Sequence, residues 1–258
     1  PQHWIMGTKL LELLKVLEIP TTVLEDDESA ADAALAAASA VMDETGTSAA
    51  LIVRRGLFEP GPSPSPPDDR QPHRRDYIEA LAGSVDKRDL VLGTTGYTGR
   101  ELRQAMPRPG SFYTAGSMGC IGSVGLALAR EQPSRRVYVL DGDGALLMKL
   151  GTLATIGLYQ PANLVHIVFD NGQYESTGGQ PTASRAVNFP GLAENSGYTY
   201  ATSVDTLDEF HGFLTRARSQ DGPIMCHVRV QPGTQPHLPR PDQSPEQLRD
   251  ELRGFLTQ

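Results

Sequence analysis

The sequence predicts an α/β protein built on a doubly wound parallel sheet. From Arg75 to the C-terminus, short apolar segments of strand type alternate with helical segments, which is the pattern of repeated βαβ units. The strand segments are apolar throughout instead of alternating with polar residues, as expected of parallel strands buried on both faces. Glycine and aspartate follow several of these strands directly. Ligands in such sheets bind beyond the carboxyl ends of the strands, so these residues are candidates for a site.

The elements of this region follow in order from the pattern. We predict helices at 75–85, 98–106, 118–129, 145–159, 207–218 and 244–256. We predict strands at 89–95, 136–140, 164–170, 200–204 and 223–230.

The first part of the chain predicts a separate piece of α/β structure. Leucines on one face predict a helix at 8–17, an alanine-rich run predicts a second at 29–44, and an apolar strand follows at 49–54. A helix followed by a strand is typical of the end of a doubly wound domain. We therefore assign residues 1–58 to the C-terminal part of such a domain. Residues 59–73 hold six prolines and form an expected linker before a domain at 74–258.

Composition excludes several classes of protein. The 258 residues carry a net charge of −8, and the arginine pairs are isolated, so no basic stripe is present for nucleic acid. The two cysteines lack the spacing of a zinc site or a disulfide framework. Neither a membrane-length apolar run nor a signal peptide is visible, and we expect a cytoplasmic protein. Because the first residue is proline, we expect the chain to be a fragment, a processed chain or the ordered part of a longer one.

Two predicted strands end in polar residues that suit a metal and a phosphate. The first runs into Gly142-Asp143-Gly144, directly before a helix, and the second ends in Asp170-Asn171. Carboxylate and amide oxygens favour Mg²⁺ or Ca²⁺ over zinc, and the free N–H groups of a helix start favour a phosphate. A simple strand-to-helix turn explains the first motif alone equally well, but not the pair. A nucleotide-binding protein is disfavoured, since neither a P-loop nor a G-x-G-x-x-G unit is present.

Two further glycine-rich segments are expected near the same edge of the sheet. Gly93-Thr-Thr-Gly96 lies at a strand end, and Gly116-Ser-Met-Gly119 leads into a helix. Gly119, Gly122 and Gly125 share one face of that helix, where tight packing is the simpler explanation for the last two.

These segments together resemble one family, the phosphonopyruvate decarboxylases. The resemblance rests on TTGYTGREL at 94–102, FYTAGSMG at 112–119, DGDGALLM at 141–148, GTLATIG at 151–157 and DNGQYESTGGQPT at 170–182. The tail at 238–245 and the first seven residues also resemble the family, the latter matching the later half of its pyrimidine-binding domain. The resemblance implies the thiamine-diphosphate-binding fold, thiamine diphosphate and Mg²⁺ as cofactors, and a small 2-oxo acid as substrate.

The resemblance also assigns site residues. The metal ligands are Asp143, Asn171 and the Gln173 carbonyl. Met118 is the apolar wedge that holds the cofactor bent, unless it only fills the core. The full set of cofactor-binding residues is Thr95, Gly96, Gly116, Ser117, Met118, Gly142, Asp143, Gly144, Ala145, Asn171, Gln173 and Tyr174.

The implied reaction is the non-oxidative decarboxylation of 3-phosphonopyruvate to phosphonoacetaldehyde and CO₂ in phosphonate metabolism. The cofactor carries the chemistry and the protein positions it. Glu175 is assigned with Met118 to catalysis, as a proton donor or orienting group, although a surface glutamate is an equal reading. Arg100, Lys149 and Arg185 are candidates for binding the phosphonate.

Departures from the family leave alternatives open. Members commonly carry histidine at the positions of Lys149 and Tyr174, and the segment from Asp170 also resembles the sulfopyruvate decarboxylases. The glutamate that activates the cofactor's pyrimidine in this family has no match here. The resemblance therefore implies a homo-oligomer or a partner chain that supplies it, with a non-catalytic diphosphate-binding module as the alternative.

Overall fold

A computed structural model describes residues 4–59, 71–240 and 242–257. The chain divides into two compact units, Pro1–Ser63 and Pro64–Gln258. Most of the expected linker at 59–73 lies outside the described residues. No helix in the described ranges is long and apolar enough to cross a membrane.

The first unit contains two helices and a two-stranded parallel sheet. Its elements are α1 (Trp4–Val16), β1 (Thr21–Val23), α2 (Glu28–Thr45) and β2 (Ala50–Ile52). Asp27 caps the start of α2 by accepting a hydrogen bond from the Ala30 N–H, and Gly46 ends it in the left-handed conformation. The two predicted helices and the strand near residue 50 are present, whereas the short strand β1 gave no signal of its own.

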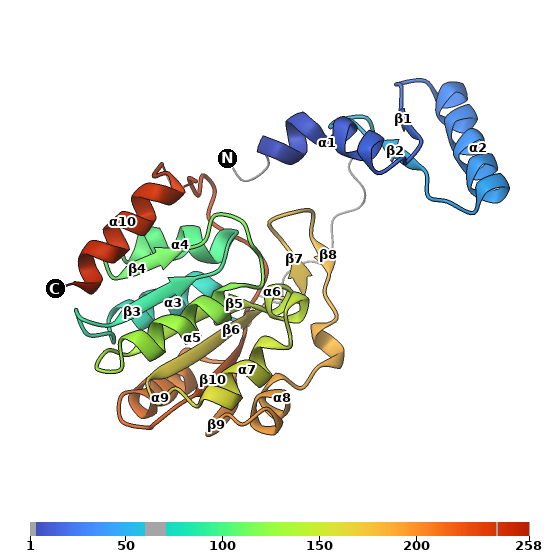
Figure 1. Cartoon of the computed structure of the whole chain (residues 1–258). Coiled ribbons are helices and arrows are strands. Elements are labelled where there is room, and N and C mark those ends of the chain that lie inside the picture. The colour runs from blue at the N-terminus through green and yellow to red at the C-terminus, as the bar shows by residue number, and fades with distance from the viewer. Residues whose placement is uncertain (1–3, 60–70, 241, 258) are drawn as a thin grey trace. The chain divides into compact units, whose positions relative to one another are not determined.

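The second unit is built on a six-stranded parallel sheet with the order β4-β3-β5-β6-β10-β9 (Figure 1). The strands are β3 (Leu90–Gly93), β4 (Ser111–Tyr113), β5 (Val137–Gly142), β6 (Leu164–Asp170), β9 (Tyr200–Val204) and β10 (Ile224–Arg229). The chain passes from β3 outward to β4 and then returns to β5 on the other side of β3. The strand order therefore reverses between β3 and β5, and such a reversal opens a crevice at the carboxyl ends of the strands.

Helices cover both faces of this sheet and bury one apolar cluster on each. The first face is covered by α3 (Arg74–Ala82), α4 (Tyr97–Ala105) and α9 (Leu207–Ala217). The second is covered by α5 (Ile121–Glu131), α6 (Asp143–Met148), α7 (Thr152–Tyr159), α8 (Phe189–Asn195) and α10 (Pro245–Leu256). Alternate residues of β3 follow this division, since Val91 packs on the first face while Leu90 and Leu92 pack on the second. The predicted doubly wound parallel sheet is confirmed.

Three details differ from the predicted elements. The helix predicted at 145–159 is two helices, α6 and α7, because the chain leaves the helical conformation at Lys149 and Gly151 then caps α7. The helix predicted from Met118 begins only at Ile121, because Gly116, Ser117 and Gly119 have positive φ angles. Strand β4, helix α8 and the two-residue strands β7 (Gln173–Tyr174) and β8 (Gln180–Pro181) were not predicted.

Candidate functional site

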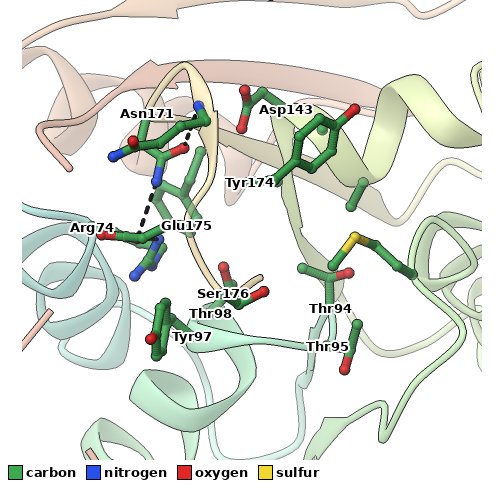
Figure 2. A pocket seen from close by; sticks show the side chains of 16 residues that line it. Arg74, Thr94, Thr95, Tyr97, Thr98, Asp143, Asn171, Tyr174, Glu175 and Ser176 are labelled. Carbon is green, nitrogen blue, oxygen red and sulfur yellow. Dashed lines mark hydrogen bonds and ion pairs between the residues drawn. The ribbon is translucent and has the colours of Figure 1, made fainter. Parts of the chain in front are cut away.

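A pocket lies at the carboxyl ends of β3, β5 and β6 (Figure 2). Ten of the predicted site residues line it: Thr95, Met118, Gly142, Asp143, Gly144, Ala145, Asn171, Gln173, Tyr174 and Glu175. Six further residues complete the lining: Arg74, Thr94, Tyr97, Thr98, Phe169 and Ser176. Gly96, Gly116 and Ser117 do not line the pocket.

Asp143 is a buried carboxylate at the start of α6. Its side chain is 3% exposed, and Thr182 donates a hydrogen bond of 2.5 Å to its Oδ2. The pKa of Asp143 is raised to about 7, chiefly because the carboxylate is buried; the Thr182 hydrogen bond lowers the pKa, and the neighbouring Asp170 carboxylate raises it. In the described part of the chain, no Lys, Arg or His forms an ion pair with Asp143. A buried carboxylate in this position suits a bound cation.

Asp170 also lies beside Asp143 but already has a hydrogen-bonding partner in His227. His227 Nε2 lies 2.9 Å from Asp170 Oδ2, and the His227 ring is held on its other side by Ser203, 3.0 Å from Nδ1. Burial raises the pKa of Asp170, but the hydrogen bonds from His227 and Ser184 outweigh it, so the pKa lies below its usual value. Asp170 Oδ1 accepts a hydrogen bond from the Gly172 N–H and so shapes the turn after β6.

Asn171 is oriented by two hydrogen bonds. Its Oδ1 accepts from the Gln173 N–H at 3.1 Å, which closes an Asx turn, and its Nδ2 donates to Glu175 Oε2 at 3.1 Å. Because β5 and β6 pair in register, with Gly142 opposite Phe169, Asp143 and Asn171 follow two adjacent strand ends. The two side chains predicted to hold the metal thus line the same pocket, and so does the third predicted ligand residue, Gln173.

Two glycines of the site are required by close packing. A Cβ at Gly144 would lie 2.3 Å from Cε1 of Tyr174, so only glycine lets the helix start approach this ring. A Cβ at Gly96 would lie 3.1 Å from the Ser176 hydroxyl, and Gly96 has a φ of 98°. Both contacts join the segment after β6 to the other strand ends.

The segment 116–119 is an irregular turn between β4 and α5. Gly116, Ser117 and Gly119 have φ angles of 88°, 53° and 87°, and a non-glycine residue such as Ser117 adopts this region at a cost. The Gly116 N–H donates to Thr95 Oγ1 at 3.1 Å, which ties the turn to the end of β3. Met118 of this turn lines the pocket, whereas Gly116 and Ser117 do not.

Glu175 has both of its carboxylate oxygens engaged. Oε2 accepts from Asn171 and, at 3.3 Å, from Arg74, while Oε1 accepts from the Gly233 N–H. Arg74 in turn binds Glu101 through Nε at 2.7 Å and Nη2 at 3.1 Å. Burial opposes the charge on Arg74, but the two glutamates outweigh it and raise its pKa. Glu175 thus accepts hydrogen bonds from three donors.

The candidate phosphonate ligands Arg100, Lys149 and Arg185 do not line the pocket. Arg100 lies over the Tyr97 ring at 5.2 Å, and the Lys149 side chain lies against Gly119. Arg74 is the cation that lines the described pocket, and sequence reasoning missed it together with Thr94, Glu101 and Thr182. The Glu101 and Thr182 positions fall inside the resemblance segments, which is the signal that could have found them.

The donor set of the pocket fits a hard divalent cation with a diphosphate. The Glu175 carboxylate is engaged by other residues, but the Asp143 carboxylate, the Asn171 amide oxygen and the Gln173 carbonyl are ligand types that Mg²⁺ and Ca²⁺ take. No group of three or more His, Cys, Asp or Glu that could hold a metal occurs in the described residues. The Thr94 hydroxyl is buried at the pocket and has no hydrogen-bond partner in the protein, so it is available to a polar group of a ligand.

Comparisons with known proteins decide the family. Residues 93–228 match the family model described as "Thiamine pyrophosphate enzyme, C-terminal TPP binding domain", which is more than half of the chain. The chain belongs to this thiamine pyrophosphate enzyme family. The matched range contains every pocket residue except Arg74.

Individual relatives narrow the family to decarboxylases. A phosphonopyruvate decarboxylase from Streptomyces viridochromogenes is 34% identical over 273 residues, covering 100% of this chain and 68% of the relative. A sulfopyruvate decarboxylase subunit beta from Methanothermobacter thermautotrophicus is 39% identical over 160 residues, covering 62% of this chain and 83% of the relative. The resemblance to thiamine-diphosphate-dependent decarboxylases is confirmed.

A solved structure shows the same fold. The thiamine diphosphate-dependent 4-hydroxybenzoylformate decarboxylase of Rhodococcus jostii RHA1 superposes with a TM-score of 0.54 at 18% identity. The match covers 67% of this chain and 35% of that chain. At this identity the likeness concerns the fold alone, and the predicted thiamine-diphosphate-binding fold is confirmed.

Proposed function

We propose that this protein decarboxylates 3-phosphonopyruvate to phosphonoacetaldehyde and CO₂, with thiamine diphosphate and Mg²⁺. The observation that carries the proposal is coverage: the similarity to a phosphonopyruvate decarboxylase extends over 100% of this chain. It therefore includes the first unit, which lies before the family match that begins at residue 93.

The residues of the pocket have distinct roles in this proposal. Asp143 and the Asn171 amide oxygen hold Mg²⁺ together with the Gln173 carbonyl. The N–H groups at the start of α6, at Gly144 and Ala145, bind the diphosphate, where glycine also allows the close approach of Tyr174. Met118 supports the bent cofactor, and Thr95 and Gly96 border it.

Thiamine diphosphate, when bound, supplies the nucleophilic carbon and the electron sink that a 2-oxo acid needs to lose CO₂. The chain's own side chains position it. For Glu175 we favour the orienting role over that of proton donor, because both of its oxygens already accept hydrogen bonds from Asn171, Arg74 and Gly233.

We also propose that residues 1–58 are the later part of a pyrimidine-binding domain and that residues 74–258 are the diphosphate-binding domain. In this proposal the chain acts as a homo-oligomer or is paired with a subunit that supplies the activating glutamate. The proposal predicts that thiamine diphosphate binding by the purified protein increases with oligomer formation.

Sulfopyruvate decarboxylation is the second candidate. A specific observation favours it: the sulfopyruvate decarboxylase subunit beta is 39% identical over its match, against 34% for the phosphonopyruvate decarboxylase. The two substrates differ only in the anionic head group, so the same pocket chemistry serves both. That match covers 62% of this chain, however, whereas the match to the phosphonopyruvate decarboxylase covers 100%.

The test is release of CO₂ and aldehyde by the full-length protein with thiamine diphosphate and Mg²⁺. Phosphonopyruvate, sulfopyruvate and pyruvate are supplied in parallel reactions, each repeated with EDTA. We expect phosphonopyruvate to give the highest kcat/KM and EDTA to abolish turnover. A higher kcat/KM for sulfopyruvate would show that sulfopyruvate, and not phosphonopyruvate, is the substrate. If the protein binds the cofactor but turns over none of the three acids, the result would favour the non-catalytic module.

A further inference from the structure

A chain of charged side chains runs from helices α3 and α4 to Asn171. Arg74 on α3 is 6% exposed, and Glu101 on α4 is 3% exposed. Arg74 also reaches Glu175, which reaches Asn171 (Figure 2). Arg74 and Glu101 serve no step of the proposed reaction, yet burying such charges is costly unless each is paired. Their placement therefore calls for a role at the site.

The Glu175 carboxylate is held from three segments of the chain. Arg74 comes from the start of α3, Asn171 from the turn after β6, and Gly233 from the segment after β10. A carboxylate that accepts from three donors on separate segments has little freedom to rotate. It is a fixed acceptor beside the Asn171 amide.

A fixed acceptor selects one orientation of that amide. An asparagine side chain presents an oxygen on one side and an NH₂ group on the other, and a flip exchanges them. Because both oxygens of Glu175 act as acceptors, for Arg74 and for the Gly233 N–H, the NH₂ group of Asn171 is the side that faces Glu175. Oδ1 then lies on the other side, where it accepts from the Gln173 N–H and keeps a second lone pair for a cation.

The geometry of arginine explains the other end of the chain. Nε and Nη2 of Arg74 bind the two oxygens of Glu101 as a fork, which leaves Nη1 to donate to Glu175. A lysine keeps the positive charge, but it cannot bind one carboxylate with a planar fork and a second carboxylate with a fixed third donor.

We infer that Arg74 and Glu175 are positioning residues that present the Asn171 amide oxygen to the divalent cation. The inference rests on the proposed function, since it concerns the same cation. Residues that orient metal ligands in this way commonly change metal affinity when they are replaced.

The test measures the Mg²⁺ dependence of thiamine diphosphate binding by calorimetry on the full-length protein. Glu175→Gln keeps the shape but no longer requires the NH₂ group of Asn171 to face it. We expect Glu175→Gln to raise the Mg²⁺ concentration needed for half-maximal thiamine diphosphate binding about 10- to 100-fold. We expect Arg74→Lys to raise the same concentration about 10-fold. Thiamine diphosphate affinity at saturating Mg²⁺ should remain close to the wild-type value, because only the cation site has changed.

Matched controls lie next to these residues. Arg75 and Glu79 form an exposed ion pair on the same helix, so Arg75→Lys and Glu79→Gln should leave the Mg²⁺ dependence unchanged. A folded Glu175→Gln protein with wild-type Mg²⁺ dependence overturns the inference, as does loss of cofactor affinity equally at all Mg²⁺ concentrations. If Glu175→Gln does not fold, the Mg²⁺ dependence of Arg74→Lys decides: wild-type dependence in this variant overturns the inference. A wild-type protein that binds no thiamine diphosphate overturns the proposed function as well.

Discussion

The Thr182 hydroxyl donates a hydrogen bond of 2.5 Å to the Asp143 carboxylate, and both side chains are buried. Asp143 follows β5, whereas Thr182 follows β8, at the far end of the loop that begins after β6. The Thr182 N–H also donates to the Gly172 carbonyl at 2.9 Å. One threonine therefore ties the segment that carries Asn171 and Tyr174 to the carboxylate of the neighbouring strand end.

Replacing Thr182 by valine should weaken both the fold and the cation site. The change preserves shape but removes the donor from a buried carboxylate, at an expected cost of about 1–3 kcal/mol in the free energy of unfolding. We expect the Mg²⁺ concentration for half-maximal thiamine diphosphate binding to rise about 10-fold. Urea unfolding and calorimetry measure the two effects. Thr155→Val on the exposed face of α7 is the control, and equal behaviour of the two variants would refute the role of Thr182.

Replacing two helical glycines by alanine should change the free energy of unfolding in opposite directions. In α7, a Cβ at Gly157 would lie 1.6 Å from the Ser196 carbonyl oxygen, so Gly157→Ala must displace backbone. We expect it to lower the free energy of unfolding by about 3 kcal/mol or more. In α9, Gly212 has no atom within 4 Å of an added Cβ, and Gly212→Ala should stabilise by about 0.5–1 kcal/mol. Urea denaturation of both variants checks the pair, and a tolerated Gly157→Ala would contradict the packing of α7 on the segment at 196.

The buried residues His166 and Tyr198 should contribute to the free energy of unfolding through their mutual contact. The His166 ring is fully buried, with Nδ1 3.0 Å from the Tyr198 hydroxyl and Nε2 3.4 Å from Asp141. Tyr198→Phe should cost about 1–3 kcal/mol by leaving the ring nitrogen without its partner. Tyr159→Phe, at an exposed ring, should cost nothing.

A double-mutant cycle separates this pair from simple packing. We expect Tyr198→Phe and His166→Phe together to cost less than the sum of the single changes, with a coupling of about 0.5–3 kcal/mol. Strict additivity in urea unfolding would show that the two side chains do not depend on each other.

The part of the site that the sequence made predictable lies at strand ends. Asp143 and Asn171 each follow an apolar run, and a parallel sheet brings such positions to one edge. The pocket residues Thr95 and Met118 came from the resemblance and not from periodicity, because a glycine-rich turn has no repeating pattern. The helix and strand alternation likewise predicted the sheet, since buried parallel strands are apolar on both faces.

The parts that were missed depend on contacts between distant segments. Arg74 pairs with Glu101 and Glu175, and nothing local to an arginine at a helix start distinguishes it from a solvent-exposed one such as Arg75. The break between α6 and α7 was missed because the apolar spacing continues through Gly151. In both cases tertiary packing decided what local sequence left open.

The most direct test of the account is thiamine diphosphate binding to the full-length protein with Mg²⁺ and with EDTA, measured by calorimetry for the wild type and Asp143→Asn. Asp208→Asn, at an exposed position on α9, is the control. We predict that the wild type and the control bind only with Mg²⁺ and that Asp143→Asn loses this binding. Equal binding in EDTA, or an Asp143→Asn protein that binds as the wild type does, would contradict a cation-bridged diphosphate at this strand edge.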